Sequence, residues 1–423
     1  MTRQPRVLLC CEHYPPSVGG VQEVMRQIAE RLAAGGVDVT VATSHHPDRA
    51  LDTVRNGVRV VSFAITGNWA KGIEGPAEEY QAFLRQGRFD ALLIKAAQQW
   101  TFDAAIDVLP ELSCRKLFIP CGFSGLHDPL YAAYFQQMPQ WLRRLDGLVF
   151  YANEYQDIAF ARAHGLSPLH LIPNGVDERE FADPSSRDIR QRLGIHPQHD
   201  LVLSVGSRLA SKGHWELVRA FGLAHLRRPT TLVINANSPG SHWKGLMKRN
   251  VKHAMKGRWP LSWLVWWHGR QQAHKRVLLI DLPRADLVDL YEAADLFVLA
   301  SHVEYSPLVL FEAAAAGTAF LATSAGNSGE IARWTGGGTV MARTRRESAE
   351  VSPVTLAREM ESMLGDPTKL RAMGQSARVA ILTKGFTWDQ IVARYRQLLL
   401  GADQHLGADG VPGELPGGQH RDR

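Results

Sequence analysis

The chain has 423 residues, of which 45% are hydrophobic and 21% are charged, and these proportions are typical of a soluble globular protein. No apolar run approaches the roughly 20 residues that a membrane-spanning helix needs, and the apolar stretch near the N-terminus is too short for a secretory signal. The length favours two domains. The four cysteines are Cys10, Cys11, Cys114 and Cys121, and their spacing is neither that of metal ligands nor that of a disulfide framework. We therefore expect a reducing, cytoplasmic location and no metal site.

The chain begins with a strand, a glycine-rich loop, a helix and a second strand. Residues 6–11 form an apolar run, and the following loop ends in Gly19-Gly20. Apolar positions then recur at helical spacing until residue 33, and residues 37–43 form the next strand. This order is that of a dinucleotide-type unit, although the three-glycine fingerprint is absent. A tight turn without a ligand explains Gly19-Gly20 equally well.

Further buried strands are predicted in the first half, with helical stretches between them, at residues 58–63, 91–95, 116–120 and 147–151. The segment LHLIPNGVD, residues 169–177, follows, and its Asn174-Gly175 pair predicts a turn. Residues 1–180 are therefore expected to form one α/β domain.

The second half begins with a strand at residues 200–207 and a basic loop before the next helix. Arg208 and Lys212 lie in that loop, at the carboxyl end of the strand, where ligands bind in open α/β sheets. Two fixed cations at this place suit a diphosphate, whereas a solvated basic loop is the alternative without function. More strands at residues 231–235, 277–281 and 296–300 predict a second domain over residues 181–386.

A basic, tryptophan-rich insertion spans residues 237–276. Its part from 241 to 276 holds nine Lys or Arg residues and no acidic residue, and the other 39 basic residues of the chain are outnumbered by 42 acidic ones. Between residues 243 and 256, apolar and lysine positions fall on different helical faces. The pattern favours a helix on an anionic membrane surface over a plain packed insertion, and a nucleic-acid patch is the least favoured reading.

The stretch from residue 295 to 330 holds the densest group of candidate site residues. A strand at residues 296–299 leads into a polar loop that contains Glu304. Ser306 is expected to cap a helix that starts at Pro307. The free N–H groups of Leu308 and Val309 would then form a phosphate site.

Glu312 follows on that helix, about one turn inside. Seven residues separate Glu304 from Glu312, and AAAAGT and SAGNSGE come next. This combination resembles the nucleotide-sugar site of the family 4 retaining glycosyltransferases. The resemblance implies an α/β GT-B architecture, in which two Rossmann-like doubly wound domains face each other across a cleft. It further implies that the helix at residues 387–400 crosses back and completes the first domain, whereas residues 401–423, rich in glycine, proline and charge, are expected to be disordered.

The same resemblance gives each candidate residue a role. Glu304 would hold sugar hydroxyls and Glu312 would accept hydrogen bonds from the ribose. The departing diphosphate would be bound by Arg208, Lys212, Leu308 and Val309, and Ser306 is counted with the substrate-binding residues. Gly19 and Gly20 would face the donor phosphates and the acceptor from the opposite domain.

One position departs from the family pattern. Many members have a histidine directly after the strand that corresponds to residues 117–120, whereas this chain has Cys121. His127 lies six residues further on and is a weak substitute, since a lone loop histidine is more often a surface residue. The replacement implies either an altered acceptor site or a reduced activity.

These features predict an enzyme that moves a sugar, with retention and without a metal, from a UDP- or GDP-sugar to a hydroxyl of a glycan or lipid-linked acceptor. The expected context is cell-surface polysaccharide or glycolipid synthesis in the cytoplasm, with the cytoplasmic face of the inner membrane as a second location. The alternative is a catalytically weak relative that acts as a sugar-binding or membrane scaffold protein. A nicotinamide oxidoreductase would need a stronger glycine fingerprint than Gly19-Gly20.

Overall fold

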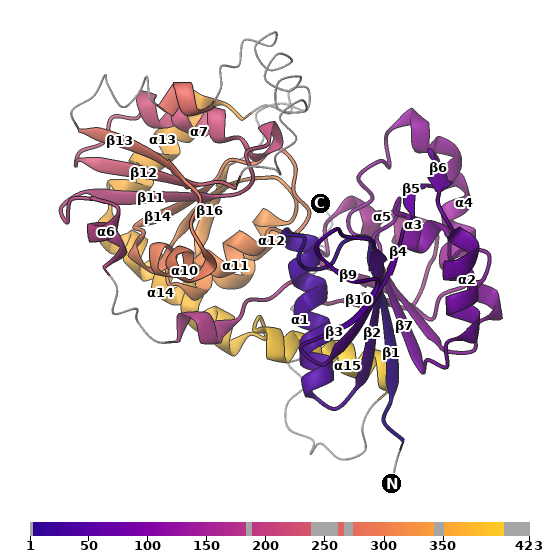
Figure 1. Cartoon of the computed structure of the whole chain (residues 1–423). Coiled ribbons are helices and arrows are strands. Elements are labelled where there is room, and N and C mark those ends of the chain that lie inside the picture. Colours follow the sequence, from indigo (N-terminus) through magenta and orange to yellow (C-terminus); the bar gives the residue numbers. More distant parts are fainter. Residues whose placement is uncertain (1–2, 183–187, 238–260, 266–273, 342–350, 402–423) are drawn as a thin grey trace.

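The computed structural model describes residues 3–182, 188–237, 261–265, 274–341 and 351–401. Two α/β units lie side by side in Figure 1, each built around its own parallel sheet. This arrangement confirms the predicted GT-B class of two Rossmann-like domains. The helical face expected between residues 243 and 256 lies outside the described residues.

The first domain contains an eight-stranded sheet in the order β10-β9-β8-β7-β1-β2-β4-β3, which is parallel except for β3. Its strands are β1 (Arg6–Cys10), β2 (Asp38–Ser44), β3 (Asp52–Arg55), β4 (Val58–Phe63), β7 (Ala91–Lys95), β8 (Arg115–Ile119), β9 (Gly147–Phe150) and β10 (Leu169–Leu171), and β5 (Thr66–Asn68) pairs separately with β6 (Gly72–Glu74). The sequence prediction missed β3, β5, β6 and β10. The β3–β4 turn uses Asn56-Gly57, both with positive φ, as a tight hairpin requires.

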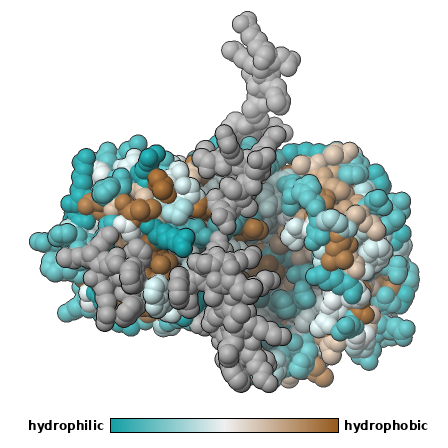
Figure 2. Space-filling view, turned by 90° about the horizontal axis from the view of Figure 1, so that it is seen from above, coloured by the Kyte–Doolittle hydropathy of each residue, from teal (hydrophilic) through white to brown (hydrophobic). Residues whose placement is uncertain are grey.

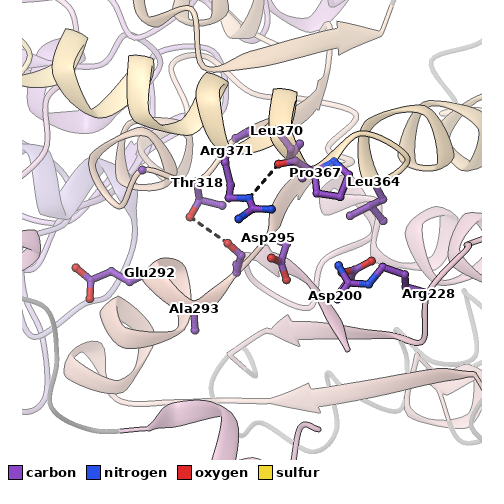
Figure 3. Close-up of a pocket in the computed structure, with 13 residues that line it drawn as sticks. Asp200, Arg228, Glu292, Ala293, Asp295, Thr318, Leu364, Pro367, Leu370 and Arg371 are labelled. Atoms are coloured by element: carbon purple, nitrogen blue, oxygen red, sulfur yellow. Dashed lines mark hydrogen bonds and ion pairs between the residues drawn. The ribbon is translucent and has the colours of Figure 1, made fainter. Parts of the chain in front are cut away.

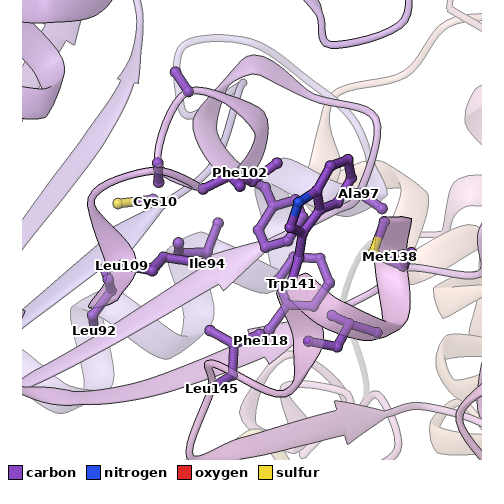
Figure 4. Packing of buried hydrophobic residues seen from close by; sticks show 14 of the residues in the cluster. Cys10, Leu92, Ile94, Ala97, Phe102, Leu109, Phe118, Met138, Trp141 and Leu145 are labelled. Atoms are coloured by element: carbon purple, nitrogen blue, oxygen red, sulfur yellow. The ribbon is translucent and has the colours of Figure 1, made fainter. Parts of the chain in front are cut away.

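Helices cover both faces of this sheet, and their apolar sides form two separate cores. They are α1 (Gly20–Ala34), α2 (Ala77–Gln86), α3 (Trp100–Asp103), α4 (Ala132–Leu142) and α5 (Gln156–Ala163), with short 3₁₀ turns at Leu109–Glu111 and Pro129–Tyr131. Figure 4 shows the core under α3 and α4, where Phe102, Phe118 and Trp141 gather. The rings of Phe102 and Phe118 stack with centroids 4.2 Å apart.

The second domain contains a six-stranded parallel sheet in the order β13-β12-β11-β14-β15-β16. Its strands are β11 (Asp200–Val205), β12 (Thr230–Asn235), β13 (Lys275–Ile280), β14 (Leu296–Leu299), β15 (Phe320–Thr323) and β16 (Gly338–Met341). From β11 the sheet continues to β12 and β13 on one side, and from β14 it continues to β15 and β16 on the other side. The carboxyl ends of these two strands therefore flank the topological switch point, where open α/β sheets bind ligands.

The helices of the second domain are α6 (Ile189–Arg192), α7 (His214–Leu223), α10 (Arg284–Ala293), α11 (Leu308–Ala315), α12 (Ser328–Thr335), α13 (Pro353–Leu364) and α14 (Pro367–Thr383), with 3₁₀ turns at Glu178–Phe181 and Ala210–Lys212. Residues 261–265, one described part of the tryptophan-rich insertion, are helical. Leu261 and Leu264 are buried there against the core beside α7. This short piece is therefore packed into the domain.

The last helix, α15 (Trp388–Leu400), lies against α1 of the first domain (Figure 1). A capping box between Thr387 and Gln390 starts the helix, and its apolar face enters the core that α1 covers. Arg31 of α1 forms ion pairs with Asp389 at 2.6 Å and with Asp177 at 2.8 Å. The C-terminal segment thus ties the two domains together.

The surface of both domains is mainly hydrophilic in the view of Figure 2, with hydrophobic residues in small groups. Within the described ranges, no helix combines the length and the apolar character needed to cross a bilayer.

The packing of α15 predicts a large loss of stability on truncating its buried face. Ile391 is fully buried, so Ile391→Ala should lower the free energy of unfolding by about 2–5 kcal/mol. Exposed Gln397 on the same helix provides the control, since Gln397→Ala should change it by no more than about 0.5 kcal/mol. Denaturant unfolding of both variants measures the difference, and equal stabilities would contradict the packing role.

Candidate active site

The loops after β11 and β14 meet at the switch point. Gly213 ends the loop that holds Arg208 and Lys212, with φ of 67°, and a Cβ atom there would lie 1.8 Å from the carbonyl oxygen of Ala300. Only glycine permits both this backbone conformation and this close approach. The basic loop therefore lies directly against the end of β14.

Lys212 and Glu304 form the ion pair at the centre of this site. The ammonium Nζ of Lys212 lies 2.6 Å from Oε1 of Glu304, and the two side chains are 27% and 12% exposed. Arg208 is half-buried, and its Nε donates to the carbonyl of Ala236 at 2.9 Å. The structure thus places two predicted cations and one predicted carboxylate in adjacent loops.

The helix start next to them is shifted by one residue from the expectation. Pro307, with an extended ψ of 113°, precedes the first helical residue Leu308, so the prediction of Ser306 as the cap was wrong. The carbonyl of Ser306 accepts a hydrogen bond from Asn174 of the interdomain segment at 2.9 Å, which fixes this backbone outside the helix. No side chain caps α11, and the first N–H groups, including those of Leu308 and Val309, remain suited to an anionic ligand.

The Gly19-Gly20 loop of the first domain faces this helix start. A Cβ atom added at Gly20 would lie 3.8 Å from Cδ1 of Leu308. Gly19 precedes α1 and has no side chain to cap it. The two helix N-termini, α1 and α11, therefore approach each other across the domain boundary.

Glu312 is held by two residues that the sequence prediction missed. The hydroxyl of Tyr291 donates to Oε2 of Glu312 at 2.8 Å, and Arg284 pairs with Oε1 at 2.7 Å. Arg284 also pairs with Glu180 at 2.5 Å, and burial keeps the pKa of Tyr291 far above its usual value. A carboxylate has about four acceptor positions, so Glu312 can be fixed in this way and still accept two hydroxyl groups.

Cys121 follows β8 after one intervening residue, Pro120, and adopts a φ of 61°. It is half-buried; desolvation raises the pKa of the thiol, and nearby Lys95 opposes this only in part. Lys95 is itself buried, and its ammonium donates to the hydroxyl of Tyr151 at 2.9 Å. The residue in the position of the family histidine is thus a neutral thiol above a buried lysine.

His127 is exposed in the loop before Pro129–Tyr131. Within the described part of the chain, no hydrogen bond or ion pair joins it to the other predicted residues.

A separate pocket of about 430 Å³ lies at the amino ends of the second sheet's strands (Figure 3). Asp200 in its wall pairs with Arg228 at 3.0 Å, and Asp295 pairs with Arg190 at 2.8 Å. Since its carboxylates already have protein partners and it faces away from the switch point, we assign it no part in the site.

The two facing domains and the charged switch point define a glycosyltransferase of the GT-B class. The family model for Glycosyltransferase Family 4 matches residues 18–180, and that for Glycosyl transferases group 1 matches residues 266–380. The chain belongs to glycosyltransferase family 4.

Individual relatives agree with this assignment. The chain is 27% identical to a glycogen synthase from Mycobacterium tuberculosis, over 94% of this chain and 95% of the relative. Among solved structures, sucrose-phosphate synthase from Thermosynechococcus elongatus superposes with a TM-score of 0.73 at 19% identity, over 93% and 98% of the two chains. Anabaena HepE in complex with UDP-glucose gives 0.68 at 17% identity, over 93% and 99%.

The contacts of Glu312 predict that Tyr291→Phe weakens nucleotide binding about fivefold to tenfold, because the carboxylate loses a hydrogen bond that orients it. Calorimetric titration with the nucleotide that binds the wild type measures this change. Tyr80→Phe is the matched control, since Tyr80 is a buried tyrosine whose hydroxyl donates to the carbonyl of Thr101 in the first domain. Equal affinities of the two variants would contradict the role of Tyr291.

Proposed function

We propose that the protein transfers a sugar, with retention, from a nucleotide diphosphate sugar to a hydroxyl group of a glycan or lipid-linked acceptor. The observation that supports this most is the Lys212–Glu304 pair beside Arg208 and the uncapped start of α11. Cations and N–H groups suit the diphosphate, and the carboxylate suits sugar hydroxyls. UDP is the first donor nucleotide to test, because HepE, which has the same fold, forms a complex with UDP-glucose.

In the proposed reaction the bond between the sugar C1 and the diphosphate oxygen breaks, the acceptor oxygen bonds to C1, and the acceptor proton passes to the departing diphosphate. Arg208 and Lys212 would balance the charge that develops on the leaving diphosphate. Lys212 can turn from Glu304 to the phosphates as the donor enters, which frees Glu304 for the sugar. Because protein cations supply this balance, the reaction is proposed to need no metal.

The proposed acceptor side is the first domain, with the Gly19-Gly20 loop and Cys121 opposite the donor residues. We further propose a role in cell-surface polysaccharide or glycolipid synthesis, with membrane contact through residues 241–276, which lie largely outside the described residues. A sugar-binding scaffold with little activity is the second candidate, and Cys121 in place of the family histidine favours it.

Removing either phosphate-facing cation should lower turnover strongly. For Arg208→Ala and Lys212→Ala we expect a kcat at least about 100-fold below that of the wild type, because the leaving group loses a preorganised charge. Exposed Lys369 on α14 serves as the control, with Lys369→Ala leaving kcat unchanged. Release of the free nucleotide in a coupled assay gives the rates, and near-normal turnover would remove the two residues from the mechanism.

The proposed independence of metal gives a second test. Transfer should proceed at the same rate in excess EDTA as with added Mg²⁺ or Mn²⁺. If activity is lost in EDTA and returns when one cation is added, the protein residues alone do not balance the negative charge of the diphosphate.

Thermal unfolding with UDP, GDP and ADP, without metal, should identify the donor nucleotide. One nucleotide is expected to raise the Tm of the wild type and not that of Glu312→Ala, since ligand binding to the folded state stabilises it. No shift with any nucleotide would favour the scaffold candidate.

A further inference from the structure

The side chain directly after Glu304 crosses from the second domain into the first. Tyr305 stacks on Tyr151 with ring centroids 5.4 Å apart, and it packs on Tyr155 at 5.0 Å. The hydroxyl of Tyr155 donates to the carbonyl of Glu304 at 3.0 Å. The loop that presents Glu304 is thus held by Tyr151 and Tyr155 from the segment between β9 and α5.

The hydroxyl of Tyr305 joins two hydrogen bonds inside this contact. It accepts from the N–H of Tyr151 at 3.1 Å and donates to the carboxylate of Asp157 on α5. Asp157 is fully buried, and its carboxylate also accepts from the N–H groups of Gly122 and Ile158, each at 2.9 Å. One carboxylate therefore connects the loop of Glu304 with the loop after β8.

The loop after β8 adopts a backbone that its residues rarely take. Cys121, Gly122 and Phe123 have φ values of 61°, 90° and 49° in succession. Such conformations are costly for side chains other than glycine and persist where contacts fix them. Here the amide of Gln156 donates to the carbonyls of Gly122 and Phe123, at 2.7 and 2.9 Å.

The fit between the two loops leaves little space. A Cβ atom at Gly122 would lie 3.1 Å from the ring of Tyr305. On the other side, Gly326 approaches the same segment so closely that a Cβ atom would lie 2.3 Å from the carbonyl oxygen of Tyr305. The ring is therefore confined between the two domains, and it has one position from which its hydroxyl donates a hydrogen bond to the carboxylate of Asp157.

We propose that Tyr305 is a positioning residue, whose hydroxyl acts through Asp157 to set the loop of residues 121–123 against Glu304. In the proposed reaction this loop borders the acceptor and Glu304 holds the donor sugar, so the inference rests on the proposed function. One hydroxyl then aligns the two halves of the site, and it does so only while the domains are in contact. Alignment of reacting groups affects the chemical step more than ground-state binding.

The test is Tyr305→Phe, which keeps the aromatic packing and removes the hydroxyl. We expect kcat to fall about tenfold while the donor KM changes by less than about twofold, the pattern of an interaction that matters in the transition state. Tyr80→Phe, which loses a buried hydrogen bond far from Glu304, should lower thermal stability and leave kcat unchanged. Unchanged kcat in Tyr305→Phe overturns the positioning role.

The pH dependence of kcat distinguishes a positioning role from a structural defect, because a structural defect would not shift it. Burial raises the pKa of Asp157 to about 6, and the donation from Tyr305 opposes this rise. Tyr305 and Cys121 both interact with Asp157, and the pKa values of both are raised, so both stay neutral near pH 6. The alignment depends on ionised Asp157, so kcat should fall below about pH 6.

Loss of the hydroxyl donor in Tyr305→Phe should shift this fall in kcat to higher pH, and Asp157→Asn should abolish it. Identical profiles in Tyr305→Phe and wild type overturn the inference while the proposed function stands. Failure of the wild type to transfer sugar from any of the three nucleotide donors would instead overturn the proposed function.

Discussion

The reversal of strand order between β11 and β14 places the carboxyl ends of two adjacent strands on either side of one crevice, and the candidate site residues depend on this adjacency. Arg208 and Lys212 follow β11, and Glu304 follows β14. About ninety residues of sequence separate the two loops, yet Lys212 and Glu304 lie within hydrogen-bond distance. The close contact at Gly213 holds the two loops together, because the carbonyl group of Ala300 leaves no space for a side chain at residue 213.

The two carboxylates of the site each have a cation already in place. Glu304 has Lys212 and Glu312 has Arg284, which limits the cost of keeping these charges partly buried. The partners of Glu312 also fix its rotamer before a ligand arrives, so less entropy is lost on binding. The positive ends of α1 and α11 face the same space and add to its preference for anions.

The contact between the domains is largely polar and reaches the site itself. Buried Glu330 on α12 accepts from the N–H of Asn153, and Asn327 donates to the carbonyl of Tyr151. Burial in this contact raises the pKa of Glu330. Polar interfaces of this kind are typical of domains that move relative to each other. The aromatic packing of Tyr305 lies within the same interface, so domain contact and the placement of Glu304 are physically coupled.

The sequence by itself determined the family, the GT-B class and most strands and helices, because apolar periodicity and the spacing of loop residues are local properties. It also predicted Arg208, Lys212 and Glu304 in loops after strands and Glu312 on the helix that follows, and the structure has them at these places. The same locality explains the error at Ser306, whose backbone is fixed by Asn174, 132 positions earlier.

Only the tertiary structure showed what holds those residues. Tyr291 and Arg284 lie 21 and 28 positions before Glu312, and Tyr305 and Asp157 lie in different domains. Each looks like an ordinary helix or loop residue in the sequence, and no periodic pattern records a hydrogen bond between distant segments. These partners are decided by how the two sheets, the crossing helix α15 and the domain interface bring the chain together.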